Sequence, residues 1–128
     1  MPRTSIELPG FGHDNPVPVA SRIGPFLFSG AITGKDPETK SFPESLDAQV
    51  ANAFGHIRAL MAAAGGSTDD IVKLSVHLAD ARDREALNRE WLAMFPDPAS
   101  RPARHVSGAE LSPGALINCE LVAVFENE

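Results

Sequence analysis

The sequence predicts an α+β fold, in which two helices pack on one face of a single mixed β-sheet to give a sandwich of two layers. Apolar residues recur at steps of three and four over residues 46–64 and 83–95, which is the helical spacing. Shorter apolar or alternating runs, bounded by glycine and proline, predict strands before, between and after these helices. The predicted order is β-β-α-β-α-β-β. The 128 residues, 43% of them hydrophobic, fit a single domain over residues 1–128.

The N-terminal third predicts a leader and a hairpin. Residues 1–14 are rich in proline, glycine and polar residues, so we expect an irregular leader there. Residues 17–23 can form a strand, although Pro18 confines it to an edge or a bulge. The Gly24-Pro25 turn then leads into an apolar strand at residues 26–30.

Both predicted helices have recognisable ends. The first, over residues 46–64, is stopped by Gly65-Gly66, where one glycine suits the left-handed cap position. Residues 67–70 resemble a capping box that opens a short turn. The second helix presents an apolar stripe and ends at the proline-rich residues 96–98; its stripe consists of Leu87, Trp91, Met94 and Phe95.

The remaining strands carry the polar residues of interest. Residues 71–78 alternate, with apolar side chains on one face and Ser75 and His77 on the other. The last quarter predicts a strand, a Pro-Gly turn and a second, strongly apolar strand that Asn118 and Glu120 interrupt. An arginine and a carboxylate that face one cavity can bind a small carboxylated substrate and handle its protons. Because the strands are apolar on both sides, we expect an oligomer to cover the sheet's other face.

Composition excludes several classes of function. A formal net charge of −6 and the absence of tyrosine argue against nucleic-acid binding, and also against RNA cleavage. No apolar run approaches the ~18 residues of a membrane span, and the N-terminus lacks a signal-peptide core. The single cysteine excludes an intrachain disulfide, and the four histidines lack metal-ligand spacing. We therefore expect a cytoplasmic protein with no metal, no cofactor and no membrane contact.

Several segments resemble the YjgF/RidA (Rid) family in order and spacing. These are SGAI and DPET at residues 29–39, AAAGGS through DIVKLSVHL at 62–78, NREW at 88–91, and PAR with LSPGALINCE at 102–120. The resemblance covers roughly residues 15–125. It implies a chorismate-mutase-like fold and a homotrimer with a small-molecule cleft at each subunit interface. The best-known members hydrolyse enamines and imines to 2-keto acids and ammonia.

The resemblance places substrate-binding residues in this chain. The arginine that binds the substrate carboxylate falls on Arg104, and a guanidinium there can bind a carboxylate bidentately. Main-chain groups at Gly30 and Val106 fall where the family contacts its ligand. Val17 stands where the family has a tyrosine. The family's active-site cysteine corresponds to Val106, or to Ser107 if the strands shift by one residue.

The resemblance also reveals a departure at the catalytic position. The water-handling glutamate of deaminating members is Asn118 here, whereas the second glutamate of the motif is Glu120. An amide cannot transfer protons near pH 7, and general acid–base catalysis contributes typically about 10²–10⁴-fold. Asn118 is a candidate for holding the water or the substrate's amino group. Glu120 is a candidate for catalysis or for pairing with an arginine across the trimer.

Other polar residues have both structural and functional interpretations. His105 should point away from Arg104's face, yet imidazole is the side chain best suited to acid–base work near neutral pH. For His77 a structural role is favoured, and Cys119 is expected to be a small buried hydrophobic side chain. Arg101 is expected to be a solvated charge.

The sequence therefore predicts a deaminase-like hydrolase that acts on a small carboxylated imine or enamine. Two alternatives stay open. One is a non-catalytic metabolite-binding or regulatory protein, suggested by Asn118. The other is a catabolic deaminase for a larger substrate such as an aminomuconate, favoured if Val17 widens the pocket.

Overall fold

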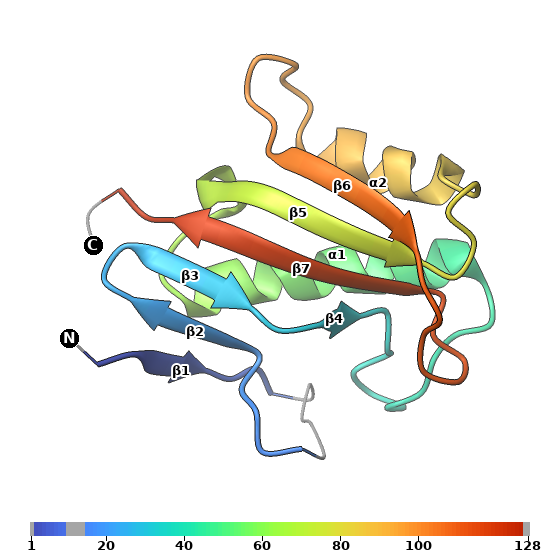
Figure 1. Cartoon of the computed structure of the whole chain (residues 1–128), viewed down its shortest axis with the longest axis horizontal. Coiled ribbons are helices and arrows are strands. Elements are labelled where there is room, and N and C mark those ends of the chain that lie inside the picture. Colours follow the sequence, from blue (N-terminus) through green and yellow to red (C-terminus); the bar gives the residue numbers. More distant parts are fainter. Residues whose placement is uncertain (1, 10–14, 127–128) are drawn as a thin grey trace.

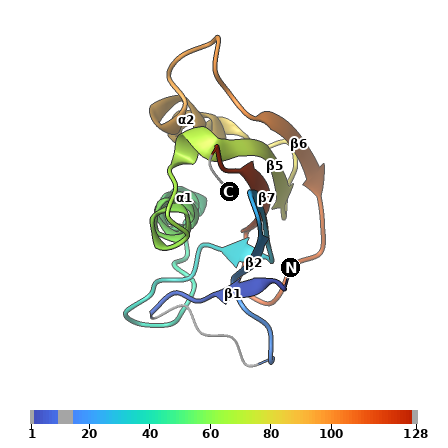
Figure 2. The ribbon, with the colours of Figure 1, turned by 90° about the vertical axis from the view of Figure 1, so that its left-hand side faces the viewer.

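A seven-stranded sheet forms one layer of the molecule, and two helices form the other (Figure 1). The computed structural model describes residues 2–9 and 15–126. Both helices lie on the same side of the sheet (Figure 2), which confirms the predicted α+β class. The elements in chain order are β1 (Thr4–Ile6), β2 (Ala20–Ile23), β3 (Phe26–Ser29), β4 (Ile32–Thr33), α1 (Leu46–Ala63), the 3₁₀ turn η1 (Thr68–Asp70), β5 (Ile71–Leu78), α2 (Glu85–Met94), β6 (Ala103–Gly108) and β7 (Ile117–Val124).

The strand order is β1-β2-β3-β7-β5-β6, and β4 also pairs with β7. The β5–β6 pair is parallel, and the other pairs are antiparallel. The last two strands of the chain are therefore not neighbours, because β5 lies between them. A Pro-Gly turn usually joins two adjacent antiparallel strands. Here the segment between β6 and β7 instead crosses over β5, which lies between them.

Strand alternation defines two faces of the sheet. On β7, Ile117, Cys119 and Leu121 are buried against the helix layer, whereas the intervening side chains project to the other side. We call that second side, which no described helix covers, the open face. Its side chains include Asn118 and Glu120.

The ends of α1 follow from local sequence. Ser45 Oγ accepts a hydrogen bond from the Ala48 N–H at 3.1 Å and caps the N-terminus. At the other end the Gly66 N–H donates to the Met61 carbonyl while Gly65 adopts a φ of 87°, as in a Schellman motif. The predicted capping box at Ser67 is also present.

The N-terminal segment differs from the prediction. Residues 4–6 lie within the expected irregular leader, but they form β1 and pair with β2. A strand of three residues is too short to show a periodicity, and the edge of β2 supplies its hydrogen-bonding partners. The rest of the predicted leader includes residues 1 and 10–14, which lie outside the described residues. Within residues 2–9 and 15–126, no helix is long and apolar enough to cross a membrane.

Candidate functional site

Arg104 lies on the edge strand β6 and points toward the helix layer. It is in register with the buried Leu74 of β5, so both side chains leave the same face of the sheet. Its guanidinium carbon lies 4.9 Å from the centroid of the Trp91 ring on α2. This cation–π contact holds the guanidinium over the Trp91 ring, and one of its nitrogens, Nη1, is buried without a hydrogen-bond partner.

The electrostatic surroundings of Arg104 favour an anion. Burial lowers the pKa of Arg104, and the positive charge of Arg84 lowers it further. An arginine side chain nevertheless stays protonated in a protein. None of the ion pairs among the described residues involves Arg104. A half-buried, unpaired cation is costly, and a carboxylate that binds both of its terminal nitrogens would remove that cost.

The two main-chain positions predicted to contact a ligand differ in what they offer. Gly30 is exposed, but its N–H donates to the Val19 carbonyl at 2.8 Å. What Gly30 presents to a ligand is therefore its carbonyl, which also accepts a hydrogen bond from Ser29 Oγ. Val106 leaves the same face of β6 as Arg104 and packs against the core.

Asn118 and Glu120 project from the open face, opposite to Arg104. Asn118 is in register with His77 on one side and Thr33 on the other. Its side-chain oxygen Oδ1 is buried and has no hydrogen-bond partner. Glu120 is exposed, and its Oε2 lies 4.0 Å from Nε2 of His77. The two predicted catalytic residues thus share one face of one strand.

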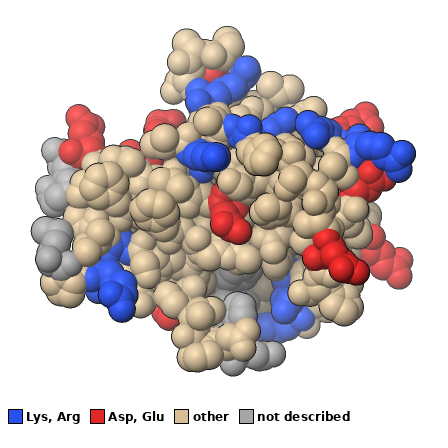
Figure 3. All heavy atoms as spheres, in the orientation of Figure 1, with Lys and Arg blue, Asp and Glu red and all other residues tan. Residues whose placement is uncertain are grey.

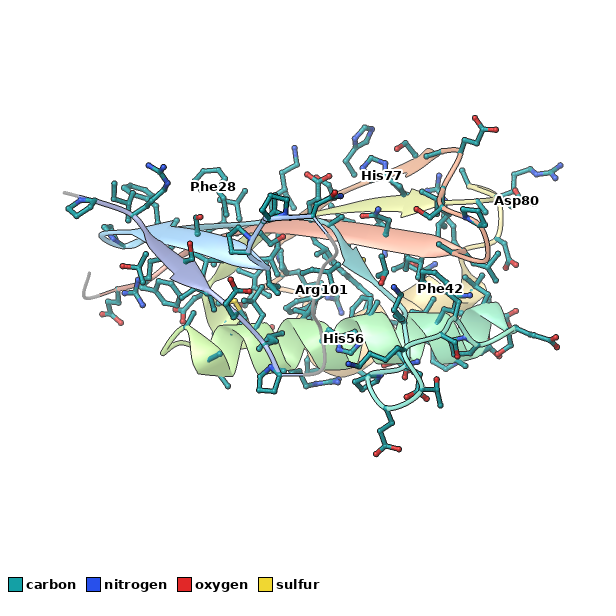
Figure 4. All side chains as sticks on the ribbon, turned by 90° about the horizontal axis from the view of Figure 1, so that it is seen from below. Phe28, Phe42, His56, His77, Asp80 and Arg101 are labelled. Carbon is teal, nitrogen blue, oxygen red and sulfur yellow. The ribbon has the colours of Figure 1, made fainter. Side chains whose placement is uncertain are left out.

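A histidine and a serine join this group. His77 Nδ1 lies 2.9 Å from Ser107 Oγ, so the imidazole sits between a hydroxyl and a carboxylate. Figure 4 shows His77 and Phe28 on the side of the sheet away from α1. Sequence reasoning favoured a structural role for His77 and considered Ser107 only as a shifted cysteine position. The feature of the sequence that could have identified His77 was the alternation of apolar and polar residues along its strand, which placed His77 on the polar face.

In a single chain the predicted residues form two separate groups. Arg104 and Val106 lie on the helix side, whereas Asn118 and Glu120 lie on the open face. Val17 is exposed, with 51% of its surface accessible, and precedes β2. One hollow of about 420 Å³ lies between Leu8 and α1, and a smaller one lies beside residues 99–102. Neither hollow is lined by a predicted site residue.

Two further residues have structural roles. Arg101 is exposed, as expected of a solvated charge, and its Nε also donates to the Phe95 carbonyl at 2.8 Å, at the end of α2. Cys119 is buried, and burial raises the pKa of its thiol to about 12, so the reactive thiolate is disfavoured. Among residues 2–9 and 15–126, no three His, Cys, Asp or Glu side chains cluster as metal ligands do.

Comparison with known proteins identifies relatives over most of the chain. The family model described as Endoribonuclease L-PSP matches residues 17–125. A RutC family protein of Aquifex aeolicus is 33% identical over 115 residues, which cover 85% of this chain and 92% of that protein. A 2-iminobutanoate/2-iminopropanoate deaminase of Salmonella typhimurium is 31% identical over 104 residues, covering 80% of this chain and 81% of the deaminase.

Solved structures share the fold. RidA from the Antarctic bacterium Psychrobacter is 29% identical and superposes with a TM-score of 0.87, covering 95% of this chain and 99% of RidA. TdcF of Escherichia coli, solved with bound serine, has a TM-score of 0.87 at 23% identity, covering 96% of this chain and 99% of TdcF. These similarities confirm the chorismate-mutase-like fold that the sequence motifs imply. The chain belongs to the endoribonuclease L-PSP family, which is the YjgF/RidA (Rid) family that those motifs resemble.

Proposed function

We propose that this protein is a deaminase-like hydrolase, which converts a small carboxylated imine or enamine to a keto acid and ammonia. The observation that carries the proposal is the buried, unpartnered Nη1 of Arg104. It suits a substrate carboxylate held by two parallel charged hydrogen bonds. The similarity to the Salmonella deaminase, at 31% identity, supports the same reaction class.

We infer that the protein acts as a homotrimer whose sites form where subunits meet. Large apolar side chains are exposed on the open face, and we expect further copies of the chain to cover them; they are Ile23 (41%), Phe26 (48%), Phe28 (57%) and Val124 (38%). Figure 3 shows this side of the molecule, where uncharged residues form most of the surface and charged residues lie mainly around its rim. A subunit interface is also one way to bring Arg104 of one chain to the open face of another.

Asn118 marks this chain as a divergent member of the family. Its amide cannot take a proton from water, but its unpartnered Oδ1 can accept a hydrogen bond from the substrate's nitrogen. The same substitution favours the alternative of a metabolite-binding protein without catalysis. No observation on the described residues favours the larger aminomuconate substrate, beyond the small, exposed Val17.

The proposal is tested by assaying ammonia and keto acid release from imino acids generated in situ by an amino-acid oxidase. We expect equal amounts of the two products. Arg104→Ala should lower kcat/KM by about 10- to 100-fold, because a charged hydrogen bond contributes about 1.5–3 kcal/mol. Arg89→Ala, at an exposed arginine on α2, is the control. Keto-acid binding that depends on Arg104, without turnover of any imine, would favour the binding protein instead.

A further inference from the structure

Three polar side chains form a row across the open face, on three different strands. Ser107 comes from β6, His77 from β5 and Glu120 from β7. The sheet order β7-β5-β6 places the histidine in the middle. His77 is directly in register with Ser107, whereas Glu120 lies diagonally opposite, within reach of a long side chain. The row exists only because β5 separates the last two strands of the chain.

The distances give the two imidazole nitrogens different roles. Nδ1 lies 2.9 Å from Ser107 Oγ, and donation from Nδ1–H to that oxygen leaves a lone pair on Nε2. Nε2 is 4.0 Å from Glu120 Oε2, which exceeds a direct hydrogen bond and suits a bridging water. A water about 2.8 Å from each atom would subtend an angle of about 90°, so it could donate one hydrogen to each. Such a water keeps its lone pairs free for attack.

The row lies beside Asn118, the position at which the family resemblance implies a glutamate in deaminating members. His77 is directly in register with Asn118, which holds that position here. The amide cannot transfer a proton, whereas imidazole is the side chain suited to gaining and losing one near neutral pH. Asn118 Oδ1 is buried without a donor, so a substrate N–H that reached it would lie next to the imidazole.

We propose that His77 is the general acid–base residue of this site, held in place by Ser107 and assisted by Glu120. This inference rests on the hydrolysis proposed above and identifies the residue that performs it in place of Asn118. Ser107 acts as a positioning residue that fixes the ring, and the Glu120 carboxylate stabilises the imidazolium.

The reaction balances with water as the only co-reactant. His77 Nε2 takes a proton from water while the water oxygen bonds to the carbon of the substrate's C=N group. The electron pair of that double bond moves to nitrogen, which takes this proton back from the imidazolium to give a neutral carbinolamine. The neutral His77 then takes the carbinolamine's hydroxyl proton and passes it to the amine as the C–N bond breaks, so that a ketone forms and ammonia leaves. The sum is one imine and one water converted to one keto acid and one ammonia.

Other titratable groups on this face must be considered in any pH profile. On the strands packed against β5 they are Glu120 and His105, which is in register with Ser75. On β5 itself Lys73 leaves the same face. His105 makes no hydrogen bond with Ser107, His77 or Glu120 in the structure, so it provides a matched control.

The test compares His77→Gln, Ser107→Ala and His105→Gln with the native protein in the imine assay over pH 5–9. We expect His77→Gln to lower kcat by about 10²–10⁴-fold, with little change in KM, and to abolish the acid limb of the kcat profile. Ser107→Ala should lower kcat by a smaller factor and change the pH profile. His105→Gln should leave both kcat and its pH profile nearly the same as in the native protein. Circular dichroism and keto-acid affinity would verify that each variant is folded and binds ligand.

The outcomes separate this inference from the proposed function. An active native protein with a His77→Gln variant of native rate and pH profile would overturn the role of His77 alone. Full activity of Arg104→Ala together with a disabled His77→Gln would overturn the carboxylate anchor and support His77. A native protein that hydrolyses no imine would overturn both.

Discussion

At the scale of single residues, two buried polar atoms stand out because the described chain satisfies neither. They are Nη1 of Arg104 and Oδ1 of Asn118. An unsatisfied buried polar group costs about 1–3 kcal/mol, and a charged group costs more. The first is a donor on the helix side of β6, and the second is an acceptor on the open face of β7. Within one chain the two atoms lie too far apart for one ligand, so a ligand with both a carboxylate and an N–H group would satisfy both only at an interface between subunits.

Cys119 shows the opposite case, a reactive group that burial makes inert. Its side chain is fully buried in the helix-facing side of β7, and burial raises the pKa of the thiol to about 12. The folded protein therefore keeps the thiol protonated at a pH where the unfolded chain loses that proton.

This difference predicts a decline of stability in alkaline solution. The ordinary thiol pKa is 9.0, so between about pH 9 and about pH 12 the unfolded chain binds fewer protons than the folded one. The free energy of unfolding should then fall by up to about 1.4 kcal/mol per pH unit from this group. Urea unfolding of the native protein and of Cys119→Ala over this pH range measures the effect. The difference between their free energies of unfolding should become smaller as the pH rises. A gap that stays constant to pH 11 would contradict the prediction.

At the scale of elements, Gln49 joins α1 to two loops. Its side chain is fully buried, and its Nε2 donates to the carbonyls of Pro43 and Gly114 at 2.7 and 2.8 Å. Its Oε1 accepts from the Leu116 N–H at 2.8 Å. Nearby, Gly34 has no room for a Cβ because the backbone of Gln49 lies against it. One side chain thus positions the loop that leads into β7, the strand that carries Asn118 and Glu120.

Gln49→Leu should therefore destabilise the protein by about 2–5 kcal/mol, because it removes all three hydrogen bonds of a fully buried amide and leaves three backbone groups without their side-chain partner. The urea midpoint at fixed protein concentration measures the change. Asp47→Ala, at an exposed position of the same helix, should alter stability by less than about 0.5 kcal/mol. A loss below 1 kcal/mol for Gln49→Leu would show that water replaces the amide.

At the scale of the whole molecule, the two faces of the sheet are both apolar, but only one is covered by helices. Phe28 on the open face has 57% of its surface exposed, although it lies in the middle of a strand. Exposed apolar patches of this kind mark sites of association. Because the predicted site residues lie on both faces, the proposed association would also determine whether they can meet.

Phe28→Glu is expected to dissociate the proposed trimer, because three added charges would have to be buried in the interfaces. Sedimentation equilibrium should give three chain masses for the native protein and one for the variant. Leu92→Glu is the matched control: Leu92 is similarly exposed, at 52%, but lies on α2. Loss of trimer in both variants, or in neither, would argue against the open face as the interface.

Much of the fold could be predicted from short stretches of sequence. The stripe from Val50 to Met61 defined α1, Gly65-Gly66 ended it, and alternation assigned the two faces of β5. The helix features depend on residues within one or two helical turns of each other, and the strand feature depends on a repeat of two residues. The motifs around Arg104 and Asn118 identified the family for the same reason, since order and spacing are properties of the chain itself.

The sequence by itself determined the helices, most strands, the family and the candidate residues Arg104, Asn118 and Glu120. Only the tertiary structure decided which strands are neighbours. It placed β5 between β6 and β7, set Arg104 and Asn118 on opposite faces, recruited residues 4–6 as β1, and assembled the row of Ser107, His77 and Glu120. The physical reason is that caps and periodicities are local, whereas strand pairing is chosen by the packing of residues distant in sequence.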